Sequence, residues 1–175
     1  MKIKFAIIGF GHIGRKHYNT LLGNAEAEVV AICDPYLEEE SIDGIPVFKD
    51  IEQMLISIPE IDVVNICTPN GLHAEQSIIC INDGKHVVVE KPMSLTKKDA
   101  ENVIFHALNK HVKIFCVMQN RYTANAQFLK HLIVNNQLGN VKEVVVNLFW
   151  NRDKRYYFSG EGLQHAWRGN ANMDG

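Results

Sequence analysis

Six residues near the start of the chain constrain its fold more than any other feature. They have the spacing GxGxxG and lie between an apolar run, Lys2–Ile8, that is typical of a strand and an amphipathic stretch, Ile13–Leu22, that is typical of a helix. In this context the first glycine permits a tight turn, the second lets backbone approach a pyrophosphate, and the third lets the helix pack closely on the strand. The alternative is a glycine-rich turn without a ligand, which the flanking segments disfavour. The six residues are Gly9, Phe10, Gly11, His12, Ile13 and Gly14.

Strand-like and helix-like segments alternate through the first 120 residues. Apolar runs buried on both faces are typical of a parallel sheet covered by helices, and right-handed crossovers then give a doubly wound sheet. The sequence therefore predicts an α/β domain over residues 1–120 that binds a dinucleotide. The expected strands are Lys2–Ile8, Glu28–Cys33, Asp62–Cys67, His86–Glu90 and Lys113–Met118. The expected helices are Ile13–Leu22, Asp50–Ser57, Leu72–Asn82 and Thr96–Asn109.

The pattern changes after residue 120. Ala124–Asn135 is expected to form a helix and Val141–Trp150 a long strand, whereas residues 151–175 show no clear periodicity. One helix and one strand cannot bury much core. We therefore expect residues 121–175 to be the incomplete start of a second α/β domain.

Composition excludes several classes of protein. Lys and Arg total 18 against 20 Asp and Glu, a formal net charge of -2, which disfavours non-specific nucleic-acid binding. No apolar run approaches the roughly 20 residues that cross a bilayer. The histidines lack metal-ligand spacing, so we expect no metal site. The cysteines form no CxxC pair and are expected to be reduced, in a cytoplasmic protein without a membrane partner. They are Cys33, Cys67, Cys80 and Cys116.

Asp34 is the candidate ligand of the adenosine ribose. It ends the second expected strand, 20 residues after Gly14, where a carboxylate accepts hydrogen bonds from ribose hydroxyls. A carboxylate there also repels a 2′-phosphate, so NAD is favoured over NADP. The alternative is a turn-forming aspartate before Pro35, and the two roles are compatible.

Two further motifs follow strands whose carboxyl ends border the expected crevice. In Cys67-Thr68-Pro69-Asn70 the Thr68 and Asn70 side chains could donate to the cofactor, with His73 beside it. The alternative is a loop in which Asn70 caps the next helix, and both interpretations stay open. In Glu90-Lys91-Pro92 the lysine is expected to point into the crevice, partly desolvated, and to accept or relay protons. The alternative is a surface ion pair between Glu90 and Lys91.

Together these motifs resemble the Gfo/Idh/MocA oxidoreductase family. The most specific element is Glu90-Lys91-Pro92 at this distance from the glycine motif. Gln119-Asn120-Arg121, Arg155-Tyr156-Tyr157-Phe158 and Trp167-Arg168-Gly169 extend the resemblance over essentially the whole chain. It implies a Rossmann domain, NAD as cofactor, and a following α/β domain whose large antiparallel sheet shapes the substrate pocket and often the interface of a homo-oligomer.

The resemblance also implies roles for individual residues. Lys91 matches the catalytic lysine, which positions and deprotonates the substrate hydroxyl. Trp167 and Arg168 match a pair on the nicotinamide side of the cofactor, and Arg121 and Tyr122 match the segment where substrate contacts begin. The matches to other positions that line the dinucleotide are Thr68, Asn70, His73, Glu90 and Gln119.

Sugars, nucleotide sugars and inositols are the substrates that the resemblance implies. The string Arg155–Gly160 is most similar to the branch that oxidises UDP-N-acetylglucosaminuronate-type substrates at C3 for polysaccharide biosynthesis. The alternatives are an inositol or simple-sugar dehydrogenase of the same family, or a non-catalytic dinucleotide-binding module. The family's catalytic histidine matches a position beyond Gly175, so we expect a truncated enzyme with one catalytic residue.

Overall fold

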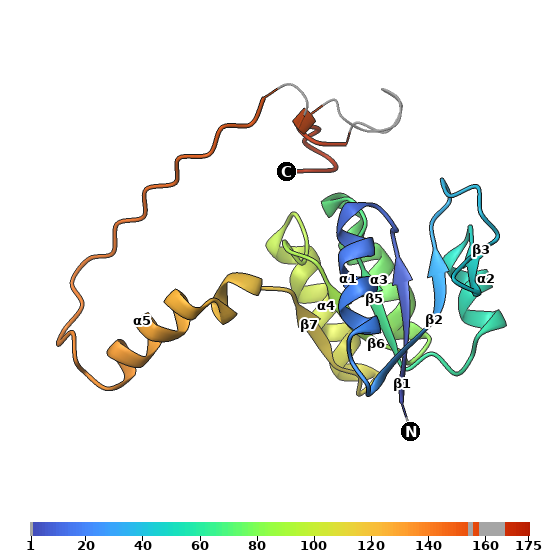
Figure 1. Cartoon of the computed structure of the whole chain (residues 1–175), viewed down its shortest axis with the longest axis horizontal. Helices are drawn as coiled ribbons and strands as arrows, with labels where there is room; N and C mark the ends of the chain where they lie inside the picture. The colour runs from blue at the N-terminus through green and yellow to red at the C-terminus, as the bar shows by residue number, and fades with distance from the viewer. Residues whose placement is uncertain (1, 154–155, 158–166) are drawn as a thin grey trace. The chain divides into compact units, whose positions relative to one another are not determined.

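The computed structural model describes residues 2–153, 156–157 and 167–175. These residues contain one seven-stranded sheet with the order β3-β4-β2-β1-β5-β6-β7 (Figure 1). All neighbouring strands are parallel except β3 and β4, so the predicted doubly wound sheet is confirmed. The strands are β1 Ile3–Ile8, β2 Ala27–Cys33, β3 Ser41–Ile42, β4 Ile45–Phe48, β5 Val63–Ile66, β6 His86–Val89 and β7 Ile114–Cys116.

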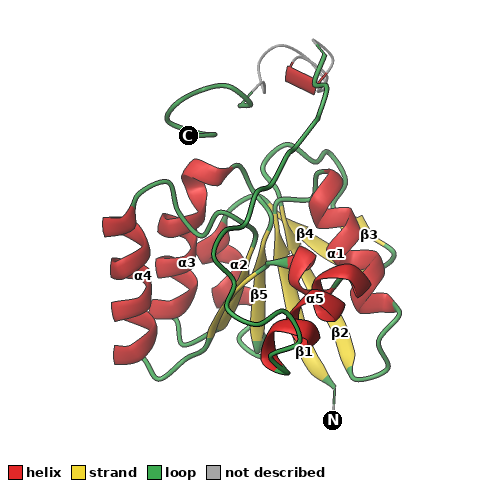
Figure 2. Cartoon of the chain, turned by 90° about the vertical axis from the view of Figure 1, so that its left-hand side faces the viewer, coloured by secondary structure: helices red, strands yellow, loops and turns green. Residues whose placement is uncertain are grey.

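Helices cover both faces of this sheet, with α1 on one side and α2, α3 and α4 on the other (Figure 2). The two faces bury separate apolar clusters because successive residues of a strand point in opposite directions. In β1, Ala6 and Ile8 pack in one cluster and Ile7 in the other. The helices are α1 His12–Leu22, α2 Ile51–Ser57, α3 His73–Asn82, α4 Lys97–Asn109 and α5 Ala124–Val134, with short 3-10 turns η1 Asn70–Leu72 and η2 Gln119–Tyr122.

The chain forms two compact units. Residues 2–117 and 169–175 make up the first, and residues 118–168 the second. The last seven residues therefore pack with the sheet domain, although the sequence interpretation grouped them with a second domain. The assignment of residues 121–175 to a substrate domain stays a prediction. Among the described residues, no helix is both long and apolar enough to span a membrane.

The strand predicted at Val141–Trp150 is wrong, because no strand pairing is found there within the described residues. Its side chains are exposed, Phe149 to 96%. An isolated extended segment has no neighbour for its backbone N–H and C=O groups, and apolar alternation alone does not supply one.

The hairpin of β3 and β4 was missed, although its turn carries a recognisable signal. Asp43 and Gly44 separate the two strands and have φ angles of 51° and 82°. Asp-Gly between apolar residues is the sequence typical of a two-residue turn with positive φ at both positions. The Tyr18 hydroxyl donates to the Asp43 carboxylate at 2.7 Å and so fixes this hairpin to α1.

Candidate functional site

The three glycines of the first turn each meet a different steric requirement. Gly9 has a φ of 83°, and a Cβ there would lie 2.8 Å from Thr68 Cγ2. A Cβ on Gly14 would lie only 2.0 Å from the Gly9 carbonyl oxygen. Around a Cβ on Gly11, by contrast, no heavy atom of the described residues lies within 4 Å. The backbone is therefore crowded at Gly9 and Gly14 and open at Gly11, where a ligand could approach.

The N-terminus of α1 opens beside this turn. Gly11 is its N-cap residue, and no described side chain caps the helix there. The first N–H groups of a helix carry a partial positive charge and bind anions when they lack other partners. The site thus has the donor set that a pyrophosphate requires.

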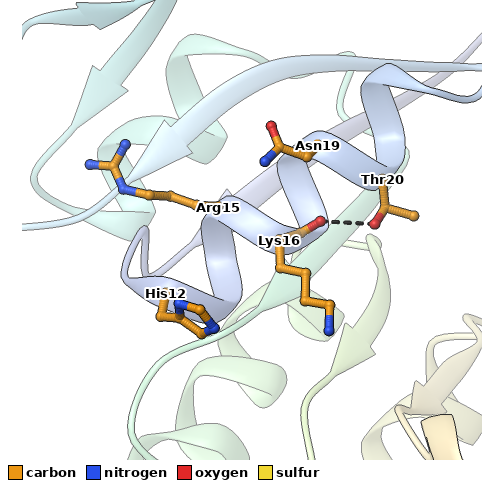
Figure 3. A pocket seen from close by; sticks show the side chains of 5 residues that line it. All are labelled: His12, Arg15, Lys16, Asn19 and Thr20. Atoms are coloured by element: carbon orange, nitrogen blue, oxygen red, sulfur yellow. Dashed lines mark hydrogen bonds between the residues drawn. The ribbon is translucent and has the colours of Figure 1, made fainter.

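The exposed side of α1 carries a shallow groove of about 520 Å³ (Figure 3). Arg15 lies over the Phe10 ring at 4.8 Å from its centroid. The Thr20 hydroxyl donates to the Lys16 carbonyl at 2.8 Å, a contact within one turn of the helix. This arrangement gives α1 a basic outer face. The residues that line the groove are His12, Arg15, Lys16, Asn19 and Thr20.

The Asp34 carboxylate is held against the glycine turn by backbone donors. Its Oδ2 accepts from Phe10 N at 2.7 Å and its Oδ1 from Tyr36 N at 3.0 Å. Each oxygen keeps a further lone pair, so the carboxylate can also accept from a ribose. The Phe10 ring is 2% exposed and meets Tyr18 edge-on, so only the Phe10 backbone belongs to the turn surface. The exposed His12 and Ile13 side chains begin α1 beside it.

The loop after β5 places Thr68, Asn70 and His73 together, but their polar groups contact protein. The Thr68 hydroxyl donates to Gln76 Oε1 at 2.6 Å. The Asn70 amide donates to the backbone oxygen and the Oδ1 of Asp174, at 3.1 Å each. Both donors that we expected to face the cofactor therefore have partners in this structure, and their role toward it stays a prediction.

Residues 169–175 pack on the same loop. Gly71 N donates to the Met173 carbonyl at 2.9 Å, and a Cβ on Gly71 would lie 2.2 Å from the Asn172 carbonyl oxygen. The Asp174 carboxylate also accepts from Gly169 N at 2.9 Å. A turn from the end of the chain thus fixes the loop that follows β5.

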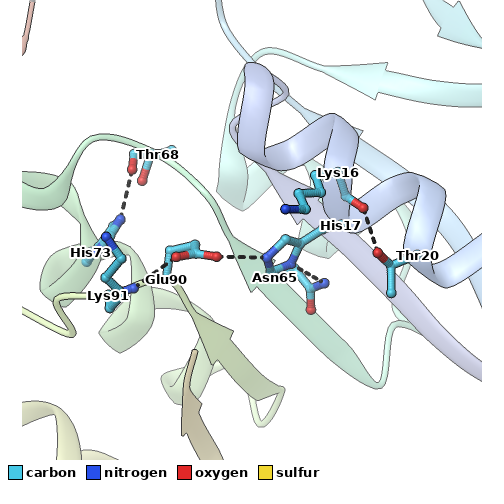
Figure 4. A network of polar contacts seen from close by, with 8 residues as sticks. All are labelled: Lys16, His17, Thr20, Asn65, Thr68, His73, Glu90 and Lys91. Atoms are coloured by element: carbon cyan, nitrogen blue, oxygen red, sulfur yellow. Dashed lines mark hydrogen bonds and ion pairs between the residues drawn. The ribbon is translucent and has the colours of Figure 1, made fainter. Parts of the chain in front are cut away.

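At the end of β6, Glu90 joins a partly buried polar network with α1 and β5 (Figure 4). His17 Nε2 lies 3.1 Å from Glu90 Oε1, and the Asn65 amide nitrogen lies 3.1 Å from His17 Nδ1. Lys91 N donates to Glu90 Oε2 at 3.2 Å. Asn65 Oδ1 is buried without a partner among the described residues. The carboxylate of Glu90 is therefore fixed from two sides.

His17 and Asn65 were missed by sequence reasoning. His17 lies three positions after Gly14 and shares its face of α1, which packs on the sheet, and this spacing was the available signal. The expected alternative, a side-chain ion pair of Glu90 with Lys91, is not what the structure shows: Glu90 pairs with His17. The expected desolvation of Lys91 is also wrong for the described residues, because its side chain is exposed.

The network changes the acidity of Glu90. Burial acts to raise the pKa of its carboxyl, but the hydrogen bonds from His17 and Lys91 N and the charges of both residues outweigh it, so the pKa is lowered. A lowered pKa stabilises the fold above the unfolded-state pKa of about 4.3, and this stabilisation is lost as pH falls through the folded-state value.

We expect wild type to be more stable than Glu90→Gln at pH 7, with the difference shrinking as pH falls below about 4.3. Urea unfolding at a series of pH values measures it. In a His17→Gln background the effect of Glu90→Gln should be smaller, because one of the hydrogen bonds is already absent. A difference that stays constant down to low pH would contradict this role of Glu90.

The remaining predicted site residues belong to the second unit. Gln119, Arg121 and Tyr122 form η2. The Arg168 guanidinium lies 4.9 Å from the Trp167 ring centroid. Their roles toward cofactor and substrate stay predictions. Of the string Arg155–Gly160, only Tyr156 and Tyr157 lie inside the described residues.

The cysteines contribute no reactive group to the site. None of the four forms a disulfide with another described residue. Burial, reinforced by nearby carboxylates, raises the pKa of Cys33 to about 12, and burial also raises that of Cys67. The described residues hold no cluster of metal-ligating side chains.

Solved structures with the same fold include two WlbA dehydrogenases in complex with NADH and UDP-GlcNAcA. The protein from Chromobacterium violaceum is 34% identical with a TM-score of 0.91, over 99% of this chain and 50% of its own. The protein from Bordetella pertussis is 33% identical with a TM-score of 0.91, over 100% of this chain and 54% of its own.

Among curated relatives, the myo-inositol 2-dehydrogenase of Thermotoga maritima is 30% identical over 78% of this chain and 42% of its own length. The D-glucoside 3-dehydrogenase of Escherichia coli is 28% identical over 79% of this chain and 41% of its own length. The chain thus spans about half the length of the relatives it matches. The model of the oxidoreductase family with an NAD-binding Rossmann fold matches residues 3–118, and the chain belongs to this Gfo/Idh/MocA family.

Proposed function

We propose that the protein is an NAD-dependent dehydrogenase of a nucleotide sugar, acting at C3 of a UDP-N-acetylglucosaminuronate-type substrate. The observation that carries the proposal is the match to both WlbA dehydrogenases, with a TM-score of 0.91 over 99% or more of the chain. The D-galactose-1-dehydrogenase of Rhizobium etli, for comparison, matches over 76% of this chain with a TM-score of 0.70. The whole length of the described chain thus resembles the nucleotide-sugar enzymes.

The residues present fit a dinucleotide. Gly11 leaves open space at the uncapped start of α1, as far as the described residues show, where a diphosphate would accept N–H donors. Asp34 lies at the end of β2 with its carboxylate fixed by Phe10 N, where it would accept from the adenosine ribose. The same negative charge would disfavour a 2′-phosphate, which supports NAD over NADP.

NAD, when bound, would accept hydride from a carbinol carbon of the sugar. We assign to Lys91 the positioning of the substrate hydroxyl and the removal of its proton. Its Nζ makes no hydrogen bond or ion pair with any described residue and is exposed, so it can meet a substrate. Glu90, held by His17, fixes the backbone from which Lys91 departs.

The second candidate is an inositol dehydrogenase. It is favoured by the curated relatives, among which the myo-inositol 2-dehydrogenase of Thermotoga maritima is 30% identical. The two candidates are separated by a substrate panel: UDP-N-acetylglucosaminuronate, myo-inositol and glucose, each with NAD, followed by the absorbance of the NADH formed. We expect the nucleotide sugar to give the highest kcat/KM. A higher value for myo-inositol would overturn the nucleotide-sugar assignment, and NAD binding without NADH formation from any of the three would favour a binding module.

Homo-oligomerisation and a cytoplasmic location stay predictions.

The cofactor assignment is tested by Asp34→Ala. The loss of hydrogen bonds to a charged acceptor is expected to weaken NAD binding by about 10-fold or more. The ratio of the affinity for NAD to that for NADP is also expected to fall. Calorimetric titration with NAD and with NADP measures both affinities. Asp62→Ala is the matched control, because Asp62 also accepts from a backbone N–H, that of Lys4 at 2.8 Å, at the other end of β1. Unchanged NAD affinity in Asp34→Ala would remove the cofactor assignment of this residue.

A further inference from the structure

A buried histidine in the sheet domain contacts two loops that border the site. The His73 ring is 1% exposed. Its Nδ1 lies 2.7 Å from the Pro92 carbonyl oxygen. Its Nε2 lies 2.8 Å from the Thr68 carbonyl oxygen (Figure 4). Thr68 follows β5 and Pro92 follows β6, two strands that are neighbours in the sheet. One ring therefore connects the carboxyl ends of both strands.

Both of these partners can only accept a hydrogen bond. A neutral imidazole has one N–H and one bare nitrogen, so it can donate to only one carbonyl. The other nitrogen would then place its lone pair against a carbonyl oxygen at hydrogen-bond distance, and two buried acceptors would lack a proton. The imidazolium form donates to both. We propose that the His73 ring is doubly protonated and that its two hydrogen bonds hold the loops after β5 and β6 together. Through Pro92, the ring thereby positions Lys91.

The helical turn that precedes His73 does little to oppose a positive charge. A helix N-terminus disfavours cations because its first N–H groups are unsatisfied. Here η1 precedes α3, and these N–H groups already donate to carbonyl oxygens. The pairs are Gly71 N with Met173, Leu72 N with Pro69, and His73 N with Asn70.

Taken together, the ionisable groups around the His73 ring do not disfavour a positive charge on it. Burial raises the pKa of Cys67, with a further contribution from the charge of Glu90, so this thiol is neutral at pH 7. Glu90 is anionic and offsets the charge of its neighbour Lys91. The ionisable side chains on the segments that contact the ring or hold η1 are Cys67, Glu75, Glu90, Lys91 and Asp174.

His73 acts through the loops and not on the substrate. Both ring nitrogens are engaged with backbone, so neither is available to a dinucleotide. Pro92 follows Lys91 directly, and holding its carbonyl limits where the lysine side chain can begin. Loss of one proton would release one of the two carbonyls and loosen the loop. The importance of this for Lys91 rests on the proposed function, whereas the charge of the ring does not.

The charge is tested without cofactor or substrate. In the chain labelled with ¹⁵N-histidine, long-range ¹H–¹⁵N correlation spectra at pH 7 distinguish protonated from bare ring nitrogens. We expect two protonated nitrogens in one slowly exchanging ring, because His73 alone among the described histidines is more than nine-tenths buried. His73→Gln should remove this signal, and His106→Gln, which changes a ring bonded to Asn82 Oδ1, should leave it in place. A bare nitrogen in the buried ring at pH 7 would overturn the proposal.

The positioning role is tested by kinetics. His73→Gln keeps an N–H donor for one carbonyl but presents an oxygen to the other. With the substrate identified by the panel, we expect kcat to fall by about 10-fold or more and the KM for NAD to change far less. His106→Gln should match wild type. A kcat unchanged in His73→Gln would refute the positioning of Lys91, whereas failure of every substrate with an intact imidazolium signal would count against the proposed function alone.

Discussion

Replacing Lys91 by methionine is expected to lower kcat by about 10²–10⁴-fold, the usual contribution of a positioned proton-transfer group. Methionine keeps an unbranched apolar chain of similar length but removes the amino group that would hold the substrate hydroxyl and, in its neutral form, accept the hydroxyl proton. The backbone N–H that donates to Glu90 Oε2 remains, so the loop should keep its geometry. The measurement is NADH formation under saturating NAD, combined with calorimetric titration of NAD.

The control for this variant is Lys98→Met, an exposed lysine in the first turn of α4. We expect its kcat and NAD affinity to equal those of wild type. A second comparison is the pH dependence of kcat, in which the limb due to the proton acceptor should vanish in Lys91→Met. If kcat fell less than threefold while binding was unchanged, another group would have to carry the proton transfer.

Gly14→Ala is expected to destabilise the sheet domain by about 1–3 kcal/mol, because an added methyl group has no room in a packed interior. The new Cβ would lie 2.0 Å from the Gly9 carbonyl oxygen, which is backbone and cannot rotate away. α1 would have to move off β1, and its N-terminal N–H groups would move with it. We therefore expect a lower Tm together with weaker NAD binding, measured by thermal unfolding and calorimetric titration.

Gly11→Ala separates the two effects of that change. Its Cβ would meet no heavy atom of the described residues within 4 Å, and its φ of −71° suits alanine. Tm should therefore stay close to wild type. The methyl group would nevertheless occupy the surface that we assign to the diphosphate, so NAD affinity should fall. Full NAD affinity in Gly11→Ala would show that the diphosphate binds elsewhere.

The sequence was sufficient wherever local chemistry decides the structure. The helix expected to begin at Thr96 begins there in the structure, where the Thr96 hydroxyl oxygen caps α4 by accepting from Asp99 N at 3.1 Å. The glycine turn has its positive φ at Gly9 and its close approach at Gly14. These features depend on residues that are near in sequence, so their patterns are visible without a fold.

Features that depend on distant partners could not be predicted in the same way. The network of His17 with Asn65 and Glu90 joins α1, β5 and the end of β6 and exists only after the sheet has assembled. The contact of Asn70 with Asp174 lies equally far beyond any local pattern. Val141–Trp150 shows the converse, since a strand-like sequence does not become a strand without a neighbour.

The turn formed by residues 169–175 has a consequence for biosynthesis. Asn70 and its partner Asp174 are 104 positions apart. A ribosome adds about 5–20 residues per second, so the loop after β5 waits roughly 5–20 seconds for the segment that completes it. During that interval the emerging sheet can pair its central strands, but the Gly71 amide has not yet met the Met173 carbonyl. The loop after β5 can therefore reach the geometry described here only after residues 169–175 have been synthesised.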